Sequence, residues 1–219
     1  MWASCQDRRW GVLVQRVIAY IDGFNLYFGL KSKGWRRYYW LNPRLLIENL
    51  LKPGQQFVGL KYFTARITNN PGDPDKHKRQ NTFLEAIESL PDTQVFYGHY
   101  LPKRQTCFQC GATWNAHEEK MTDVNIAVEL LKDAYDDAFD TAMVVSADSD
   151  LSPPVEAVRS RFPDKRVVIA CPPNRQSKRL ESVAHAYFRI GRKKFQDSQF
   201  PDEFAKPDGF VLKRPPTWR

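Results

Sequence analysis

The sequence has no long hydrophobic run, and no stretch approaches the roughly 18 apolar residues that a membrane span needs. Residues 1–15 include Trp2, Trp10, Arg8 and Arg9 but no apolar core, so they match neither a secretion signal nor a transit peptide. Cysteine is also scarce, with 4 in 219 residues, which argues against a disulfide framework. These absences predict a cytoplasmic protein without membrane association, in which residues 1–15 form an N-terminal extension.

Acidic residues are outnumbered by basic ones. The chain has 25 Asp and Glu against 33 Lys and Arg, which gives a formal net charge of +8 and a pI near 9.3. This surplus favours a polyanionic partner, because each phosphate contact releases counterions from a nucleic acid, although many basic proteins bind no nucleic acid. With 42% hydrophobic residues, the chain is long enough to bury one core as a single domain of moderate size.

From Arg16 onward, short strand-like runs alternate with helical patterns. The strand-like runs are rich in apolar, branched or aromatic residues and cover residues 17–22, 57–67, 93–101, 141–146 and 166–171. Apolar residues at helical spacing fill the gaps, and the last of these patterns joins Leu180, Val183 and Tyr187. Strands that alternate with helices imply βαβ crossovers and a mainly parallel sheet covered on both faces. The predicted fold class is α/β.

Two stretches break this alternation and set the domain boundaries. Residues 102–120 contain CFQCGATW and insert more than a simple loop into a strand-to-helix connection. Residues 191–219 form a basic, proline-bearing tail, so the domain itself is predicted to cover residues 16–190. The tail is either partly docked on the domain through its phenylalanines or partly disordered. These phenylalanines are Phe195, Phe200, Phe204 and Phe210.

Carboxylates follow the predicted strands at the edge where open α/β sheets bind ligands. Asp22 comes directly after the first strand, and Asp148 and Asp150 follow the fourth. Asp123 opens the helix that precedes the fourth strand, with Thr122 as its expected N-cap. Taken singly, each aspartate is better explained by a turn, a cap or a helix dipole than by catalysis. Three separate segments that bring carboxylates to one edge favour a common site.

Converging carboxylates would repel one another, and a hard divalent cation relieves that repulsion. Mg²⁺ or Mn²⁺ takes oxygen ligands and keeps several waters, which leaves room for a scissile phosphate. Two such ions about 4 Å apart activate an attacking water and stabilise the leaving oxygen. Asn25 stands three residues after Asp22 and is expected in the first helical turn, where its amide can hold a phosphate or a metal-bound water.

Other hydrolytic chemistries are not supported. We find no Ser-His-Asp or Cys-His arrangement for nucleophilic catalysis. A phosphatase of the haloacid dehalogenase type needs a second aspartate two residues after the first, and Phe24 occupies that position after Asp22.

Three segments carry these residues: YIDGFNLYFGL, EEKMTDVNIAVELLKDA and VVSADSDLSPPVEAV. In this order and spacing they resemble the bacterial NYN domains, which are relatives of PIN nucleases and of the LabA-like family. The resemblance covers about residues 16–190. It implies a PIN-like three-layer sandwich, with a central, mainly parallel sheet of about five strands and helices on both faces.

The resemblance also implies an activity, which is Mg²⁺- or Mn²⁺-dependent cleavage of RNA by an endoribonuclease that uses a metal-activated water. Carried over position by position, it implies an acidic metal site with Asn25 as its polar companion. The acidic residues are Asp22, Asp123, Asp148 and Asp150. Domains of this type also serve as binding modules, so an RNA-binding or regulatory role with weak or no catalysis stays open. Cleavage of structured DNA is a further alternative.

A Cys-x-x-Cys-Gly motif lies within the insertion. Cys107 and Cys110 supply two of the four ligands that a structural zinc ion needs. His99, His117 and Cys5 are candidate donors for the rest, and a second protomer in a homodimer is another source. The alternative is a pair of reduced thiols in a small loop. Both interpretations stay open.

Basic and aromatic residues are mixed in residues 31–40, right after the first candidate site segment. Arg36 and Arg37 are the central cations, and neighbouring rings suit single-stranded RNA through phosphate contact and base stacking. The alternative is a solvated turn whose aromatic residues feed the core. Lys120 stands just before Asp123 and is placed to contact a phosphate.

Overall fold

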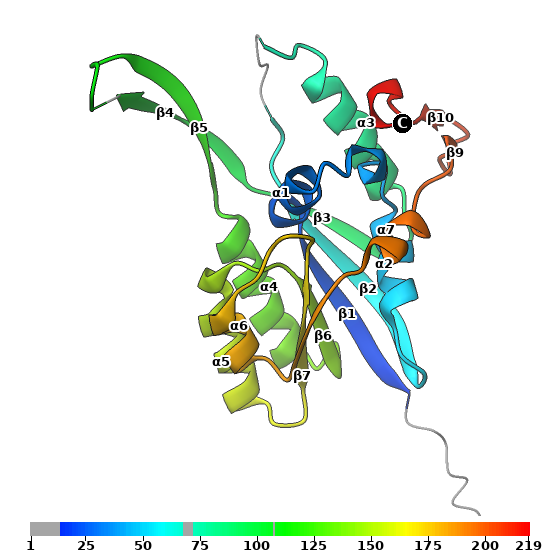
Figure 1. Cartoon of the computed structure of the whole chain (residues 1–219). Helices are drawn as coiled ribbons and strands as arrows, with labels where there is room; N and C mark the ends of the chain where they lie inside the picture. Colours follow the sequence, from blue (N-terminus) through cyan, green and yellow to red (C-terminus); the bar gives the residue numbers. More distant parts are fainter. Residues whose placement is uncertain (1–13, 68–71, 107) are drawn as a thin grey trace, which may run out of the picture.

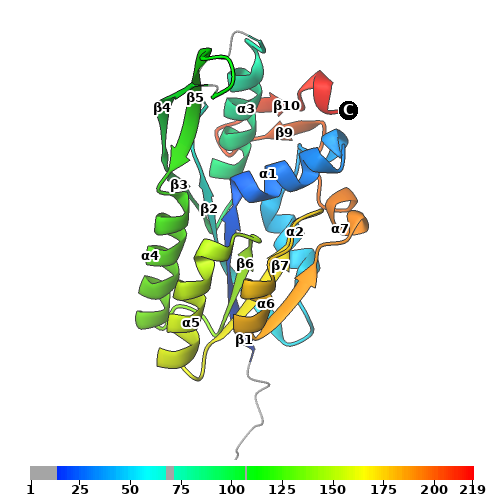
Figure 2. The same ribbon diagram turned by 60° about the vertical axis from the view of Figure 1, so that its left-hand side comes forward.

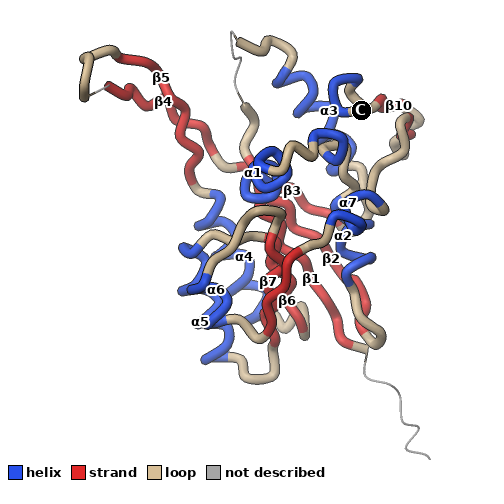
Figure 3. The backbone as a smooth tube through the Cα atoms, viewed as in Figure 1, coloured by secondary structure: helices blue, strands red, loops and turns tan. Residues whose placement is uncertain are grey.

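The computed structural model describes residues 14–67, 72–106 and 108–219. Within these residues, six strands form one central sheet in the order β3-β2-β1-β6-β7-β8, and every neighbouring pair is parallel (Figures 1 and 3). The predicted α/β class with a mainly parallel sheet is confirmed. The strands are β1 (Gln15–Asp22), β2 (Gln55–Thr64), β3 (Thr93–Tyr97), β6 (Thr141–Val145), β7 (Arg166–Cys171) and β8 (Ala186–Arg189).

The sheet has one strand more than the five expected, because the last helical pattern splits into a helix and a strand. Helix α6 (Lys178–Val183) ends before Tyr187, which lies in β8. The Tyr187 hydroxyl accepts a 3.0 Å hydrogen bond from the backbone N–H of Ser177, the N-cap of α6. The strand pairs with β7 from Val168 onward. Three apolar positions are too few to separate one long helix from a short helix followed by an edge strand.

Alternating side chains of β1 pack into two separate hydrophobic clusters, one on each face of the sheet. Val17, Ala19 and Ile21 pack in one hydrophobic cluster, whereas Ile18 and Tyr20 pack in the other. Two sets of helices cover these two faces (Figures 1 and 2). The first face is covered by α1 (Gly23–Ser32), α2 (Pro43–Leu50), α3 (Lys76–Glu88) and α7 (Arg192–Gln196), and the second by α4 (Thr122–Tyr135), α5 (Ser152–Arg161) and α6. No helix in the described part of the chain is long and apolar enough to cross a membrane.

The insertion forms an antiparallel hairpin that stands away from the sheet (Figure 1, upper left). Its strands are β4 (His99–Thr106) and β5 (Thr113–Lys120), so it begins three residues before the predicted boundary at residue 102. The hairpin leads directly into α4. Cys107 lies outside the described residues, and Cys110 is exposed near the tip of the hairpin.

The C-terminal tail packs onto the domain. It contains α7, a small sheet of β9 (Glu203–Ala205) and β10 (Val211–Lys213), and a final 3-10 helix, η3 (Pro216–Trp218). Phe195 and Phe200 are buried, and Phe200 joins Trp218 and Trp40 in a third hydrophobic cluster. Phe210 is 59% exposed. Of the two alternatives drawn from the sequence, docking therefore describes the tail, but Phe210 takes no part in it.

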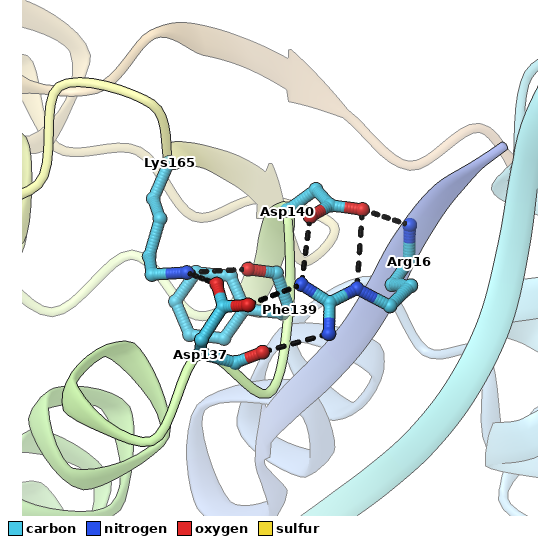
Figure 4. A network of polar contacts seen from close by, with 5 residues as sticks. All are labelled: Arg16, Asp137, Phe139, Asp140 and Lys165. Carbon is cyan, nitrogen blue, oxygen red and sulfur yellow. Dashed lines mark hydrogen bonds and ion pairs between the residues drawn. The ribbon is translucent and has the colours of Figure 1, made fainter. Parts of the chain in front are cut away.

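A polar network ties the start of β1 to the loop before β6 (Figure 4). The Arg16 guanidinium donates to both carboxylate oxygens of Asp140 and to the backbone carbonyl of Asp137. Lys165, whose side chain is buried, donates to the Asp137 carboxylate and to the carbonyl of Phe139. The Arg16 side chain holds the pKa of Asp140 below its usual range, and Lys165 followed by Arg16 does the same for Asp137.

This network predicts a pH-dependent contribution to stability. A carboxylate whose folded pKa lies below its unfolded value of about 3.9 stabilises the fold above that value and loses the effect as the pH falls through the folded pKa. We therefore expect Asp140→Asn to melt below the parent protein at neutral pH, with the gap closing below about pH 4. Thermal melts across this range measure the gap. A gap that stays constant with pH would contradict the assignment.

Candidate active site

Asp22 ends β1 and is almost completely buried, with 4% of the residue exposed. Its Oδ1 accepts a 2.9 Å hydrogen bond from the backbone N–H of Asn25, and this bond caps α1. Its Oδ2 accepts a 2.9 Å hydrogen bond from the hydroxyl of Ser146. The aspartate is therefore a helix cap, and the same contacts hold its carboxylate in one orientation at the end of the strand.

Gly23 lets α1 start close against β2. A Cβ atom there would lie 2.8 Å from the carbonyl oxygen of Phe63 and 2.8 Å from the ring of Tyr62. The glycine after Asp22 is thus required by close packing. Burial raises the pKa of the Tyr62 hydroxyl, and the charge of Asp22 raises it further, so this hydroxyl keeps its proton beside the carboxylate.

The segment after β6 joins the segment after β1 through hydrogen bonds. Ser146 donates its hydroxyl to Asp22 and accepts the backbone N–H of Asp148 at 3.1 Å. The side-chain oxygen of Asn25 accepts the backbone N–H of Ala147 at 3.2 Å. Because β1 and β6 are parallel neighbours, these bonds hold Asp22 and Asp148 at adjacent strand ends.

Asp148 and Asp150 lie at the start of a 3-10 helix, η2 (Ser149–Leu151). Asp148 is half-buried, and its Oδ1 accepts the backbone N–H of Asp150 at 3.1 Å. Asp150 is exposed. The two residues thus differ in burial, and Asp148 is the better fixed of the two.

Asp123 lies in the first turn of α4, where the positive end of the helix dipole stabilises a carboxylate. Helix α4 packs against β1 and η2, and its first turn lies at the edge where the parallel strands end (Figures 1 and 2). The expected N-cap role of Thr122 is wrong. Met121 occupies the capping position with a φ of 78°, and Thr122 is the first helical residue, because the chain leaves β5 through a left-handed turn.

A cavity of about 610 Å³ opens beside Asp22. Gly23 and Tyr62 form part of its wall, and further lining residues come from α1, α3, η3, the 3-10 helix η1 (Arg36–Tyr38) and the adjoining loops. Arg36 lines this cavity, whereas Arg37 is exposed outside it, with its guanidinium 5.9 Å from the centre of the Tyr38 ring. Of the two arginines predicted to bind RNA, only Arg36 therefore lines the cavity.

Lys76 and Arg79 also line the cavity, although neither was predicted as a site residue. They are three residues apart on α3 and so share one face, while Lys78 points elsewhere and pairs with Asp75 at 3.0 Å. The three-residue spacing of Lys76 and Arg79 predicts that they share one face of a helix. The sequence does not indicate that this face lies opposite α1.

The remaining candidates lie on the hairpin. Lys120 is the exposed last residue of β5, next to the start of α4. His99 is exposed at the start of β4, and the side chain of His117 lies outside the described part of the structure. Among the described residues, no group of three or more His, Cys, Asp or Glu side chains is arranged to hold a metal ion. Asp22, Asp123, Asp148 and Asp150 all belong to the described residues, so the structure does not bring three of them together as one ligand set. The acidic metal site and the zinc site both stay predictions.

Comparison with known proteins identifies the class. The model of the NYN domain family matches residues 16–191, most of the chain, so this protein belongs to the NYN domain family, a nuclease-like family. The resemblance found in the sequence motifs is confirmed. A crystal structure of a protein of unknown function from Vibrio parahaemolyticus RIMD 2210633 has the same fold, with a TM-score of 0.55 and 20% identity over 86% of this chain and 98% of that one.

The chain is also similar to a protein named 6-hydroxy-3-succinoylpyridine 3-monooxygenase HspA, from Pseudomonas putida (strain DSM 28022 / S16). The two sequences are 26% identical over 197 residues, which cover 74% of this chain and 61% of the relative. This chain therefore spans less than two thirds of the length of that protein.

Proposed function

We propose that this NYN domain protein is a divalent-metal-dependent endoribonuclease that hydrolyses RNA at the edge formed by the ends of β1 and β6. The observation that best supports the proposal is the position of Asp22 and Asp148 at adjacent strand ends, where the Ser146 hydroxyl bonds to the carboxylate of Asp22 and to the backbone N–H of Asp148. Ligands of open parallel sheets bind at this edge.

The chemistry of these donors fits Mg²⁺ or Mn²⁺. In proteins, Mg²⁺ is commonly held by one or two carboxylates, while waters and substrate phosphates complete its octahedron. Asp22 and Asp148 supply such a pair, and Asp123 and Asp150 are additional carboxylates expected to act through waters. When bound, the metal would supply Lewis acidity and an activated water for hydrolysis.

Hydrogen bonds within the chain fix the positions of the site residues. Ser146 and the backbone of Asn25 fix the Asp22 carboxylate, and the Asn25 side chain holds the loop that carries Asp148. Lys120 precedes α4 on the exposed side of this edge, where its ammonium group can attract the RNA backbone. No side chain is required to form a covalent intermediate.

The P. putida relative supports a second candidate function, which is action on a small aromatic acid. Its name describes a monooxygenase that acts on a hydroxypyridine with an acidic side chain. The cavity beside Asp22 is lined by aromatic and basic residues, which also suit a small anionic ring. We place this candidate second because the match leaves over a third of that relative uncovered.

A cleavage assay on RNA, single-stranded DNA and flap DNA tests the proposal, with Mg²⁺, Mn²⁺ or EDTA present. We expect RNA to be cut internally in the presence of either metal and to stay intact in EDTA. Cutting of DNA alone would favour the structure-specific DNA nuclease, and RNA binding without any cutting would favour the binding module.

Metal binding has its own test that needs no substrate. Adding Mn²⁺ should raise the melting temperature of the parent protein by mass action. At a Mn²⁺ concentration of a hundred times the dissociation constant, binding adds about 2.7 kcal/mol to the free energy of unfolding. Asp148→Asn should show much less of this rise, while both proteins melt alike in EDTA or the variant melts slightly higher. An equal rise in both proteins would remove Asp148 from the metal site.

A further inference from the structure

The cavity beside Asp22 has the size of a ligand site and is built from distant parts of the chain. Its volume of about 610 Å³ lies within the range of about 300–1,000 Å³ that small-molecule sites occupy. Its walls come from α1, η1, the end of β2, α3 and, from the C-terminal tail, Trp218. The docked tail therefore closes one side of the cavity.

Aromatic rings form much of this wall. Phe24 and Phe28 stack with ring centres 6.5 Å apart, and Tyr27 contacts Tyr39 at 5.1 Å. Phe28 remains 43% exposed, so a large part of its ring is free of protein contacts. Burial raises the pKa of the Tyr39 hydroxyl to about 12, so Tyr39 presents a neutral ring. Flat aromatic ligands, nucleic acid bases among them, bind by stacking against exposed rings of this kind.

The charge of the wall is positive. Four cations line it, and Asp73 is the one acidic residue among its described lining residues. Arg79 forms an ion pair with Asp73, which leaves a surplus of three positive charges. The cations are Lys31, Arg36, Lys76 and Arg79. A ligand for this cavity should therefore carry negative charge as well as a flat ring.

The position of the cavity selects among such ligands. Gly23, which follows Asp22 directly, belongs to its wall, as does Tyr62, whose ring approaches Gly23. A nucleotide bound here would contact Gly23, so the phosphodiester that joins it to the next nucleotide of a strand can extend toward the neighbouring Asp22. A free aromatic acid has no such extension.

We infer that this cavity is a subsite for a single nucleotide of a single-stranded RNA, with the base against Phe28 and its neighbours and the phosphate against Arg36 and Lys76. The inference rests on the proposed function and extends it, because the subsite would place the adjoining phosphodiester at the edge that carries Asp22 and Asp148. Only an unpaired nucleotide can enter, since a concave site of this size has no room for a duplex.

Binding measured in EDTA tests the subsite independently of cleavage. The probe is a fluorescein-labelled hexauridylate, with UMP, inorganic phosphate and nicotinate as unlabelled competitors. Phe28→Ala should weaken binding about 10-fold, within the range for loss of one stacking contact. Arg36→Ala and Lys76→Ala should each weaken it several-fold and lower the slope of its salt dependence by about 1.

A matched control lies next to the cavity on α3. Lys78→Ala removes the same charge as Lys76→Ala from an exposed position outside the cavity, so its affinity should stay within about 2-fold of the parent. Equal losses in the Lys76 variant and this control would overturn the subsite. Competition by nicotinate with no competition by UMP would also overturn it, in favour of a small aromatic acid.

The outcomes also separate the subsite from the nuclease. Selective loss of binding in the cavity variants, in a protein that cuts no RNA, would keep the subsite and reject the ribonuclease. Metal-dependent cutting of RNA, with unchanged binding in all cavity variants, would keep the ribonuclease and reject the subsite.

Discussion

Replacing Asp148 by asparagine is expected to lower the rate of RNA cleavage by about 100-fold or more, because the loss of one carboxylate ligand removes several kcal/mol of charge stabilisation. The fold should survive. Asparagine keeps a side-chain oxygen that can accept the backbone N–H of Asp150, and the residue is only half-buried. Single-turnover cleavage of a labelled RNA with Mn²⁺, together with a thermal melt in EDTA, measures both effects.

Asp164→Asn is the matched control for this experiment. Asp164 is exposed and precedes β7, so the same chemical change occurs at the opposite edge of the sheet and should leave cleavage unchanged. Asp22→Asn should reduce cleavage as strongly as Asp148→Asn, with some loss of stability because Asp22 caps α1. Full activity of both the Asp22 and Asp148 variants would refute the site.

The second large effect concerns a buried ionic network that holds α4 on the sheet. Lys61 of β2 contacts the carboxylate of Glu129 at 2.5 Å and that of Asp133 at 2.7 Å, and the Tyr20 hydroxyl donates to Asp133 at 2.6 Å. Replacing Lys61 by methionine removes the cation that both carboxylates share and, among the described residues, leaves Glu129 with only the exposed Lys132 nearby. Breaking a buried ion pair in this way costs about 3–5 kcal/mol.

Urea unfolding at neutral pH measures this loss, and Lys132→Met is its control. Lys132 also faces Glu129, at 3.7 Å, but its side chain is 59% exposed, so its replacement should cost at most about 0.5 kcal/mol. Tyr20→Phe should fall between the two, at about 1–3 kcal/mol, because it removes one buried donor from Asp133. A Lys61 variant as stable as the Lys132 variant would mean that the network adds nothing.

Much of the fold could be read from local patterns. The run VIAYID predicted β1, because side chains on a strand alternate between two faces and both faces here are apolar. Five strands and the helices between them followed from the same reasoning. The missed strand β8 has only four residues, and its pattern merged with that of α6. Short edge elements depend on their pairing partner, which the local sequence does not reveal.

The candidate site, like the fold, could be predicted only in part from the sequence. Asp22, Asp123 and Asp148 were predicted because they stand next to elements that the sequence makes recognisable, and parallel strands bring their ends to one edge. The sequence did not indicate the role of Gly23, since its close approach to Phe63 joins residues 40 positions apart. Lys76 and Arg79 were overlooked for a similar reason.

By itself, the sequence determined the α/β class, the family and the acidic residues at the strand ends, because each of these depends on residues close together in the chain. Only the tertiary structure decided that the tail packs against Trp40 through Trp218, that Arg36 but not Arg37 lines the cavity, and that Lys61 forms ion pairs with two carboxylates of α4. These contacts join segments far apart in the sequence. They form when apolar faces are buried together, and no local spacing encodes which faces will meet.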